Sequence, residues 1–272
     1  MPHVSDDLGR PLDIEPPPRR IISLVPSLTE LLFALGVCSL VVGVTRYCTE
    51  PVSALRNLPK VGGTKNPDLA LVQELRPELV LANAEENRRE DVEKLQAMGL
   101  RVMVTYPRSV ADVARVVRTV AQVTGAYEVG QSLAAAIERA AASVPAAVAI
   151  RVFCPIWKNP WMSFGTDTYG NDLLRIAGAR NVCLGADARY PIVELERVAE
   201  QNPEVILLPD EPYRFAPKDL GDLAPLSSTE AVRSGRVYFV SGKALTWFGP
   251  RTPGAVRYLR SFLPLPESPA WG

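Results

Sequence analysis

Aromatic side chains gather in the segments that follow predicted strands. All four tryptophans fall outside the predicted strands and helices, and Trp157, Trp161 and Trp247 stand in such loops. A buried Trp or Tyr ring covers roughly 150–250 Å², which at about 25 cal/mol per Å² contributes roughly 4–6 kcal/mol. Several such rings hold a large, flat ligand without charge pairing, whereas a small ion makes no use of them. The alternative is that these rings only cover the hydrophobic core.

Two arginines accompany the rings. Arg46 directly precedes Tyr47 after one predicted strand, and Arg251 follows Trp247 after another. A guanidinium pairs with ligand carboxylates or phosphates, although either arginine also fits a solvated surface. The candidate ligand-binding residues are Tyr47, Trp157, Tyr190, Trp247, Phe248, Arg46 and Arg251.

Residues for bond-making chemistry are scarce. His3 is the only histidine, which argues against Ser–His triads and histidine zinc sites. No nucleophile elbow, phosphate-binding loop or paired carboxylates stand out, and we interpret Glu85 and Glu211, which follow strands, as cap or surface groups. The four cysteines lack C-x-x-C spacing and are expected to be buried free thiols, with one or two disulfides as the alternative outside the cytoplasm. The sequence therefore predicts a binding protein with no catalytic residue, no resident cofactor and no metal site.

Composition limits the partners. The 30 basic and 30 acidic side chains cancel, which argues against nucleic acid. The first apolar run, residues 21–44, contains Pro26, Ser27 and Glu30 and is too polar to span a membrane. The first twenty residues lack the basic and apolar regions of an export signal, so we expect a cytoplasmic protein if that absence is genuine.

Short apolar runs alternate with helical patterns, which favours α/β units with mainly parallel strands flanked by helices. Predicted strands cover 20–25, 40–45, 78–82, 101–106, 148–153, 204–208 and 236–240. Predicted helices begin at a Ser27–Glu30 capping box and at an Asn66–Pro67 start, and further helices cover 88–98, 110–123, 127–144, 169–177, 194–201, 229–234 and 252–262.

An internal repeat indicates two lobes. Residues 71–85 align with residues 197–211 at an offset of 126, pairing Pro77 with Pro203 and Glu78 with Glu204. The expected organisation is an N-terminal tail (1–18), an α/β lobe (19–126), one connecting helix (127–144), a second α/β lobe (145–263) and a tail (264–272). Ligands of open α/β sheets bind at the carboxyl ends of the strands, so we expect a ligand cleft between the lobes.

Several segments carry a family resemblance. In the first half they are RRIISLVPSLTELLFALG, VVGVTRYCTEP and LPKVGGTKNPDLALVQELRPELVLA, and in the second half FGTDTYGNDLLRIAGARNV, LERVAEQNPEVILLPDE and TWFGPRTPGAVRYL. Together they resemble the substrate-binding proteins of ABC importers for cobalamin and ferric siderophores. The resemblance implies two Rossmann-like lobes joined by one long rigid helix, a metal-chelate ligand, a permease partner and a location in the periplasm or cell envelope. We expect a monomer.

The resemblance also implies roles for single residues. Tyr47, Tyr190 and Trp247 match ligand contacts of the cobalamin branch, so a cobalamin-like corrinoid is the expected ligand. A family tryptophan near Thr64 is absent, which keeps a ferric siderophore or haem open as alternatives. Glu196 matches one of two surface glutamates that dock on the permease, and Ala70 occupies the position of the other.

Two further alternatives come from other classes of protein. One is a cytosolic enzyme or chaperone that handles a corrinoid without a role in transport. The other is a signalling module that kept the fold and lost the ligand.

Overall fold

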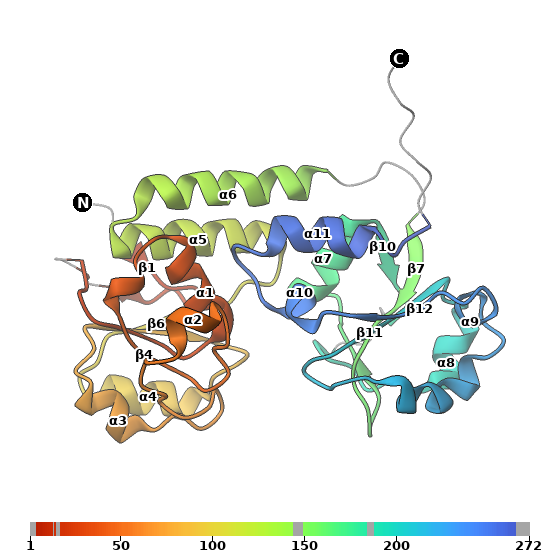
Figure 1. Cartoon of the computed structure of the whole chain (residues 1–272), viewed down its shortest axis with the longest axis horizontal. Coiled ribbons are helices and arrows are strands. Elements are labelled where there is room, and N and C mark those ends of the chain that lie inside the picture. The colour runs from red at the N-terminus through yellow and green to blue at the C-terminus, as the bar shows by residue number, and fades with distance from the viewer. Residues whose placement is uncertain (1–3, 13, 15–16, 144–148, 184–187, 265–272) are drawn as a thin grey trace, which may run out of the picture. The chain divides into compact units, whose positions relative to one another are not determined.

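The computed structural model describes residues 4–12, 14, 17–143, 149–183 and 188–264. The chain forms two compact units (Figure 1). Unit 1 comprises Met1–Pro107, Ala111–Glu138 and Phe248–Pro250, and unit 2 comprises Arg108–Val110, Arg139–Trp247 and Arg251–Gly272. No helix in the described part of the chain is long and apolar enough to cross a membrane.

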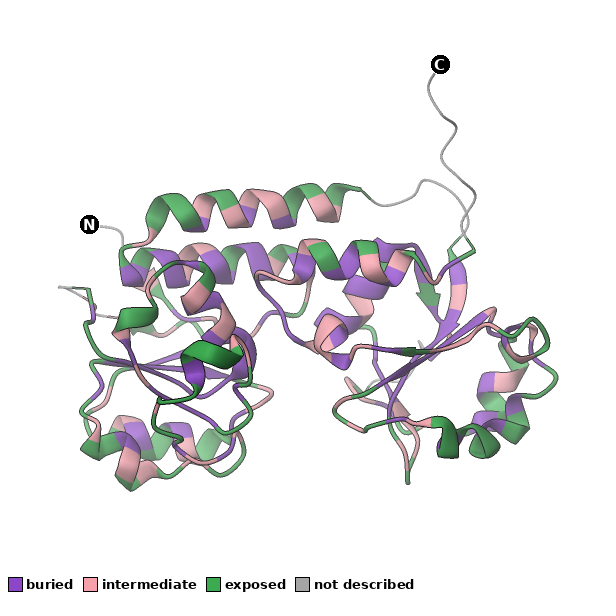
Figure 2. Cartoon of the chain, in the orientation of Figure 1, coloured by how far each residue is buried: buried purple, intermediate pink, exposed green. Residues whose placement is uncertain are grey.

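Unit 1 is built on a parallel four-stranded sheet in the order β4-β3-β5-β6. These strands are β3 (Ile21–Ser23), β4 (Val41–Val44), β5 (Leu79–Asn83) and β6 (Val102–Thr105). In Figure 1, α3 and α4 lie on one side of the strands and α5 and α6 on the other. The helices of this unit are α1 (Pro26–Ala34), α2 (Val52–Leu55), α3 (Leu69–Glu74), α4 (Arg89–Ala97), α5 (Val110–Thr124) and α6 (Tyr127–Ala142), with a 3-10 turn η1 (Cys38–Leu40). Helices on both faces explain why β5 is buried along its whole length. Figure 2 colours most of the strands at the centre of this unit purple, for buried.

Unit 2 repeats this plan. Its parallel sheet has the order β10-β7-β11-β12. The strands are β7 (Ile150–Phe153), β10 (Ala179–Asn181), β11 (Val205–Pro209) and β12 (Val237–Val240), and the helices are α7 (Tyr169–Ala177), α8 (Leu195–Glu200), α9 (Glu230–Arg233), α10 (Gly242–Thr246), α11 (Thr252–Arg260) and the 3-10 helix η2 (Pro217–Leu226). A hairpin, β8 (Pro155–Trp157) and β9 (Met162–Ser163), follows β7. The predicted α/β class with parallel sheets is confirmed.

The structure bears out the internal repeat down to single contacts. Helix α8 and strand β11 begin and end 126 residues after α3 and β5. The turns between them hold Arg76 and Asn202 in the left-handed region, at φ 47° and 46°. Glu78 accepts the Arg19 N–H at 2.5 Å, and Glu204 accepts the Arg151 N–H at 3.0 Å. In both units, therefore, the equivalent glutamate binds the backbone near the start of the first strand, just before β3 in unit 1 and within β7 in unit 2.

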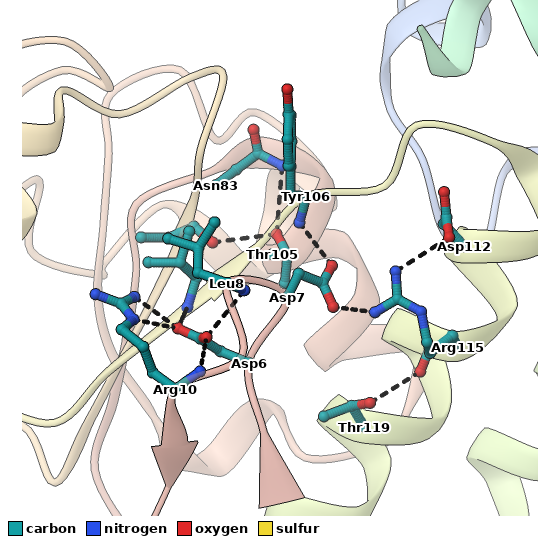
Figure 3. A network of polar contacts seen from close by, with 12 residues as sticks. Asp6, Asp7, Leu8, Arg10, Asn83, Thr105, Tyr106, Asp112, Arg115 and Thr119 are labelled. Atoms are coloured by element: carbon teal, nitrogen blue, oxygen red, sulfur yellow. Dashed lines mark hydrogen bonds and ion pairs between the residues drawn. The ribbon is translucent and has the colours of Figure 1, made fainter. Parts of the chain in front are cut away.

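A hairpin near the start of the chain covers the edge strand of the unit 1 sheet. It consists of β1 (Val4–Ser5) and β2 (Pro11–Leu12), and its turn donates the Asp7 N–H to the Val104 carbonyl at 3.0 Å. The buried Asp6 carboxylate accepts a hydrogen bond from the Val104 N–H at 3.3 Å and forms an ion pair with Arg10 at 2.6 Å (Figure 3). The stretch assigned to an N-terminal tail thus contains residues that pair with β6, an edge that would otherwise be open to other chains.

Two predicted helix starts are wrong. The helix expected from Asn66 begins at Leu69, because Asp68 is its N-cap and accepts the Leu71 N–H at 3.0 Å. The capping box at Ser27 is absent, because Pro26 is already helical and Val25 is the N-cap. The Ser27 hydroxyl is buried without a hydrogen-bond partner.

The predicted connecting helix 127–144 is seen as α6 up to Ala142, and residues 144–148 lie outside the described residues. So do residues 1–3, 13 and 15–16 of the predicted N-terminal tail and 265–272 of the C-terminal one. The lobe boundaries therefore stay a prediction.

Candidate ligand-binding site

In unit 1, Arg46 and Tyr47 follow Thr45, the first residue after the carboxyl end of β4. Tyr47 is 52% exposed, and the Arg46 guanidinium carbon lies 5.4 Å from the Tyr47 ring centroid. Arg46 also donates to Asn66 Oδ1 at 3.3 Å. A β-carbon at Gly63 would lie 3.0 Å from Arg46 Nη2 and 3.2 Å from the Tyr47 ring. This glycine therefore leaves the room in which the cation and the ring sit side by side.

Two buried asparagines, which the sequence analysis did not single out, hold the neighbouring loops. The Asn87 side chain donates to the Thr64 carbonyl at 2.9 Å and accepts the Asn83 N–H at 2.8 Å. Asn83 Oδ1 accepts the Glu85 N–H at 2.9 Å, and its amide donates to Thr105 at 3.3 Å. The loop after β5, the last residue of β6 and the loop at Thr64 are thus joined by side-chain amides. The sequence signal for these two asparagines is their position at, or shortly after, the end of a buried strand.

Tyr190 lies in unit 2 in a tightly packed loop. Its ring centroid is 6.4 Å from that of Phe164. The Gly165 N–H donates to the Arg189 carbonyl at 2.7 Å, and a β-carbon at Gly165 would lie 2.3 Å from the Ala188 carbonyl oxygen. The backbone next to Tyr190 is therefore fixed against the segment that precedes α7.

Trp247 is buried, with only 7% of its surface exposed. Lys243 Nζ lies 4.8 Å from its ring centroid and the Arg251 guanidinium carbon 5.1 Å away. Cations at these distances are attracted to the indole. Phe248 is also buried and clusters with unit 1 rather than with Trp247. Both rings are covered by protein groups. The cationic groups of Lys243 and Arg251 are the ones that contact the indole of Trp247.

Glu211 stands at the carboxyl end of β11 beside this indole. Thr246 Oγ1 donates to its carboxylate at 3.3 Å. Burial raises the pKa of Glu211, although the hydrogen bonds from Thr246 and Trp247 and the charge of Lys243 act in the opposite direction. The interpretation of Glu211 as a simple surface group does not fit this position, because its side chain is half-buried and bonded to α10.

Trp157 belongs to the β8–β9 hairpin and is 42% exposed. Its ring meets Tyr213 edge-on at 5.9 Å. The next residue, Lys158, forms ion pairs with Asp219 at 2.5 Å and with Asp222. Hydrogen bonds to these carboxylates raise the pKa of Lys158, and the bond from Lys158 lowers that of Asp219. By contrast, Trp161 stacks on Phe215 at 5.7 Å and packs against the core of unit 2.

A hollow of about 600 Å³ lies beside this hairpin, within unit 2. Its walls include Lys158, Trp161, Ile192, Glu196 and Asp222. Glu196, the predicted docking residue, is exposed in the first turn of α8. Among the described residues, no group of three or more His, Cys, Asp or Glu side chains could hold a metal ion.

Comparisons with known proteins point in one direction. The family model described as "Periplasmic binding protein" matches residues 21–244. A vitamin B12-binding protein of Vibrio cholerae is 24% identical over 255 residues, 92% of this chain and 91% of the relative.

Solved structures agree with this match. The periplasmic vitamin B12 binding protein BtuF of Vibrio cholerae has 22% identity and a TM-score of 0.78, covering 90% of this chain and 96% of its own. The periplasmic heme-binding protein BhuT in complex with two hemes has 31% identity and a TM-score of 0.77, covering 89% and 97%. With its two parallel α/β units and a match over most of its length, the chain belongs to the periplasmic binding protein family, whose members are receptors of ABC transport and not enzymes.

Proposed function

We propose that the protein binds a cobalamin-like corrinoid and delivers it to an ABC importer. The observation that carries this proposal is the exposed Tyr47 ring beside Arg46 at the carboxyl end of β4, where open α/β sheets bind ligands. The vitamin B12-binding relatives, which align with up to 92% of the chain, support a corrinoid. Tyr190 and Trp157 in unit 2 supply further aromatic surface, and Lys243 and Arg251 supply polar contacts over Trp247.

A second candidate ligand is haem or another iron chelate. The 31% identity to BhuT, whose structure contains two hemes, favours it. The same aromatic residues would serve either ligand, since both are large, flat rings around a metal. Because the family consists of receptors, a corrinoid-handling enzyme is not proposed.

Ligand titration tests this proposal. Cyanocobalamin, haemin and a ferric siderophore are titrated separately against the purified protein while tryptophan fluorescence is followed, with calorimetry as a second readout. A saturable response to cyanocobalamin at micromolar concentration is expected. Saturation by haemin alone would show that haem, and not a corrinoid, is the ligand. No response to any of the three compounds would overturn the proposal and favour a module that has lost its ligand.

The partner is proposed separately. Glu196, exposed at the edge of the hollow in unit 2, is proposed to contact the permease. Glu196→Lys should leave ligand titration unchanged and abolish ligand-dependent stimulation of the reconstituted transporter. Unchanged stimulation would remove Glu196 from the docking surface.

A further inference from the structure

The Asp167 carboxylate gathers two arginines that are far apart in the sequence. Its Oδ2 accepts Arg189 Nη1 at 2.5 Å and Arg108 Nη1 at 3.4 Å. All three residues belong to unit 2. Two guanidinium groups on a single carboxylate oxygen form the arrangement by which proteins recognise carboxylates and phosphates.

Hydrogen bonds fix the backbone of the two segments that carry these arginines. The Arg189 carbonyl accepts the Gly165 N–H at 2.7 Å, and Thr168 donates to the Gly165 carbonyl at 2.9 Å. The segment of Arg108 is fixed at Val110, whose N–H donates to the Asp172 carboxylate at 2.8 Å. The two guanidinium groups therefore start from anchored backbones rather than from free loops.

The Asp167 carboxylate between the arginines is half exposed to solvent. The Asp167 side chain is 51% exposed and that of Arg108 is 54% exposed, whereas that of Arg189 is 25% exposed. Exposed ion pairs of this kind are weak, because water competes for both partners. Another oxyanion can therefore compete with Asp167 most readily at Arg108, the more exposed and more distant of the two arginines. Arg189 is joined directly to Tyr190, one of the proposed ligand contacts.

We propose that Arg108 and Arg189 form an oxyanion subsite of the ligand-binding protein, and that Asp167 is its internal counter-ion, displaced when the ligand binds. The inference rests on the proposed function, since it assumes that the ligand contacts Tyr190. The ligand group is a carboxylate or phosphate carried on a side chain of the metal-holding ring. Cyanocobalamin carries one phosphodiester and haemin two propionates, so either ligand supplies this chemistry.

Matched ligand pairs test the subsite. Cyanocobalamin is compared with dicyanocobinamide, which lacks the phosphodiester, and haemin with its dimethyl ester, which lacks the free carboxylates. The variants are Arg108→Gln, Arg189→Gln and Asp167→Asn, and the control is Arg197→Gln, which removes an arginine from a more exposed ion pair on α8. Affinities come from fluorescence titration at low and high salt.

Arg189→Gln should weaken binding of the oxyanion-bearing member of a pair about tenfold or more and leave the other member unchanged. Arg108→Gln should act in the same direction and Asp167→Asn in the opposite one, because it removes the competing carboxylate. Arg197→Gln should change neither affinity. The salt dependence of binding should fall in both arginine variants.

Equal effects of Arg189→Gln on both members of a pair, or no effect on either, would overturn the subsite while leaving the proposed function intact. Weaker binding by Asp167→Asn would overturn the counter-ion role. No binding of any of the four probes to the wild-type protein would overturn the proposed function, and the subsite with it.

Discussion

The Asp7 carboxylate joins the turn of the first hairpin to helix α5 through Arg115. One oxygen of Asp7 pairs with the Arg115 guanidinium, and the other accepts the Tyr106 N–H at 2.6 Å (Figure 3). The side chain of Asp7 is only 6% exposed. A single carboxylate thus links the first residues of the fold to the end of β6 and to the helix that follows.

Asp7→Ala should destabilise the protein by about 1–3 kcal/mol, because the Tyr106 N–H loses its buried acceptor. Urea unfolding monitored by circular dichroism measures the change. Glu93→Ala, which removes a surface ion pair with Arg89, is the control and should have little effect. Equal stability of Asp7→Ala and wild type would show that the Asp7 carboxylate does not stabilise the fold.

Tyr47→Ala should weaken ligand binding about tenfold or more with little loss of stability, because the ring is half exposed before ligand arrives. Tyr127→Ala is the matched control, since Tyr127 is 56% exposed on α6 and carries no proposed role. Titration and thermal unfolding of both variants separate binding from folding. If both alanine variants bind like wild type, Tyr47 is not a ligand contact.

Glu211→Gln should alter the pH dependence of stability. Burial raises the pKa of Glu211 in the folded state, so the unfolded chain ionises this group at lower pH than the folded protein does. The free energy of unfolding therefore begins to fall as the pH rises through the pKa that Glu211 has in the unfolded chain. The loss is complete above the pKa that Glu211 has in the folded protein. Relative to wild type, the variant should be more stable near pH 7.5 than near about pH 4, where both states approach protonation. A constant difference between variant and wild type across this range would contradict the shift.

Gly242→Ala should destabilise unit 2 by about 1–3 kcal/mol through overpacking. A β-carbon there would lie 2.4 Å from the Glu211 carbonyl oxygen and 2.6 Å from its nitrogen, so backbone has to move. Gly254→Ala on α11 is the control, because no atom lies within 4 Å of the added carbon. Denaturant unfolding should show a loss for the first variant and none for the second, and equal values would rule out the close approach.

Cysteine labelling should distinguish Cys38 from the other three thiols. Cys48, Cys154 and Cys183 are buried free thiols as expected, but the expectation of burial is wrong for Cys38, which is exposed in the 3-10 turn η1. Burial raises the pKa of Cys48 and Cys154 and raises that of Cys183 to about 11. Brief alkylation at neutral pH followed by mass spectrometry should find one label at Cys38. Rapid labelling of Cys154 would show that its surroundings open to solvent.

Regular elements with clear periodicity could be predicted from the sequence. Helix α7 was expected at its observed bounds, and the repeat anticipated both α8 and β11. The starts of α1 and α3 could not be placed, because several neighbouring residues compete for a cap. At α3 the N-cap is Asp68 and not Asn66. Helix α1 already begins at Pro26, one residue before Ser27. The β8–β9 hairpin was missed, since its turn, rich in Pro and Asn, resembles a loop.

The candidate site was predictable in part. The aromatic residues after strands were recognised, but the burial of Trp247 beneath Lys243 and Arg251 depends on tertiary packing that no local pattern encodes. The roles of Asn83 and Asn87 were also hidden, because both bridge loops that are distant in sequence.

The two sheets share one strand order, yet equivalent positions after β5 and β11 have diverged. Asn87 of unit 1 corresponds to Tyr213 of unit 2, so an amide that ties loops together in one half is an aromatic ring packed on Lys158 in the other. The duplicated scaffold thus carries unlike side-chain chemistry at equivalent positions of its two copies, so neither unit could stand in for the other.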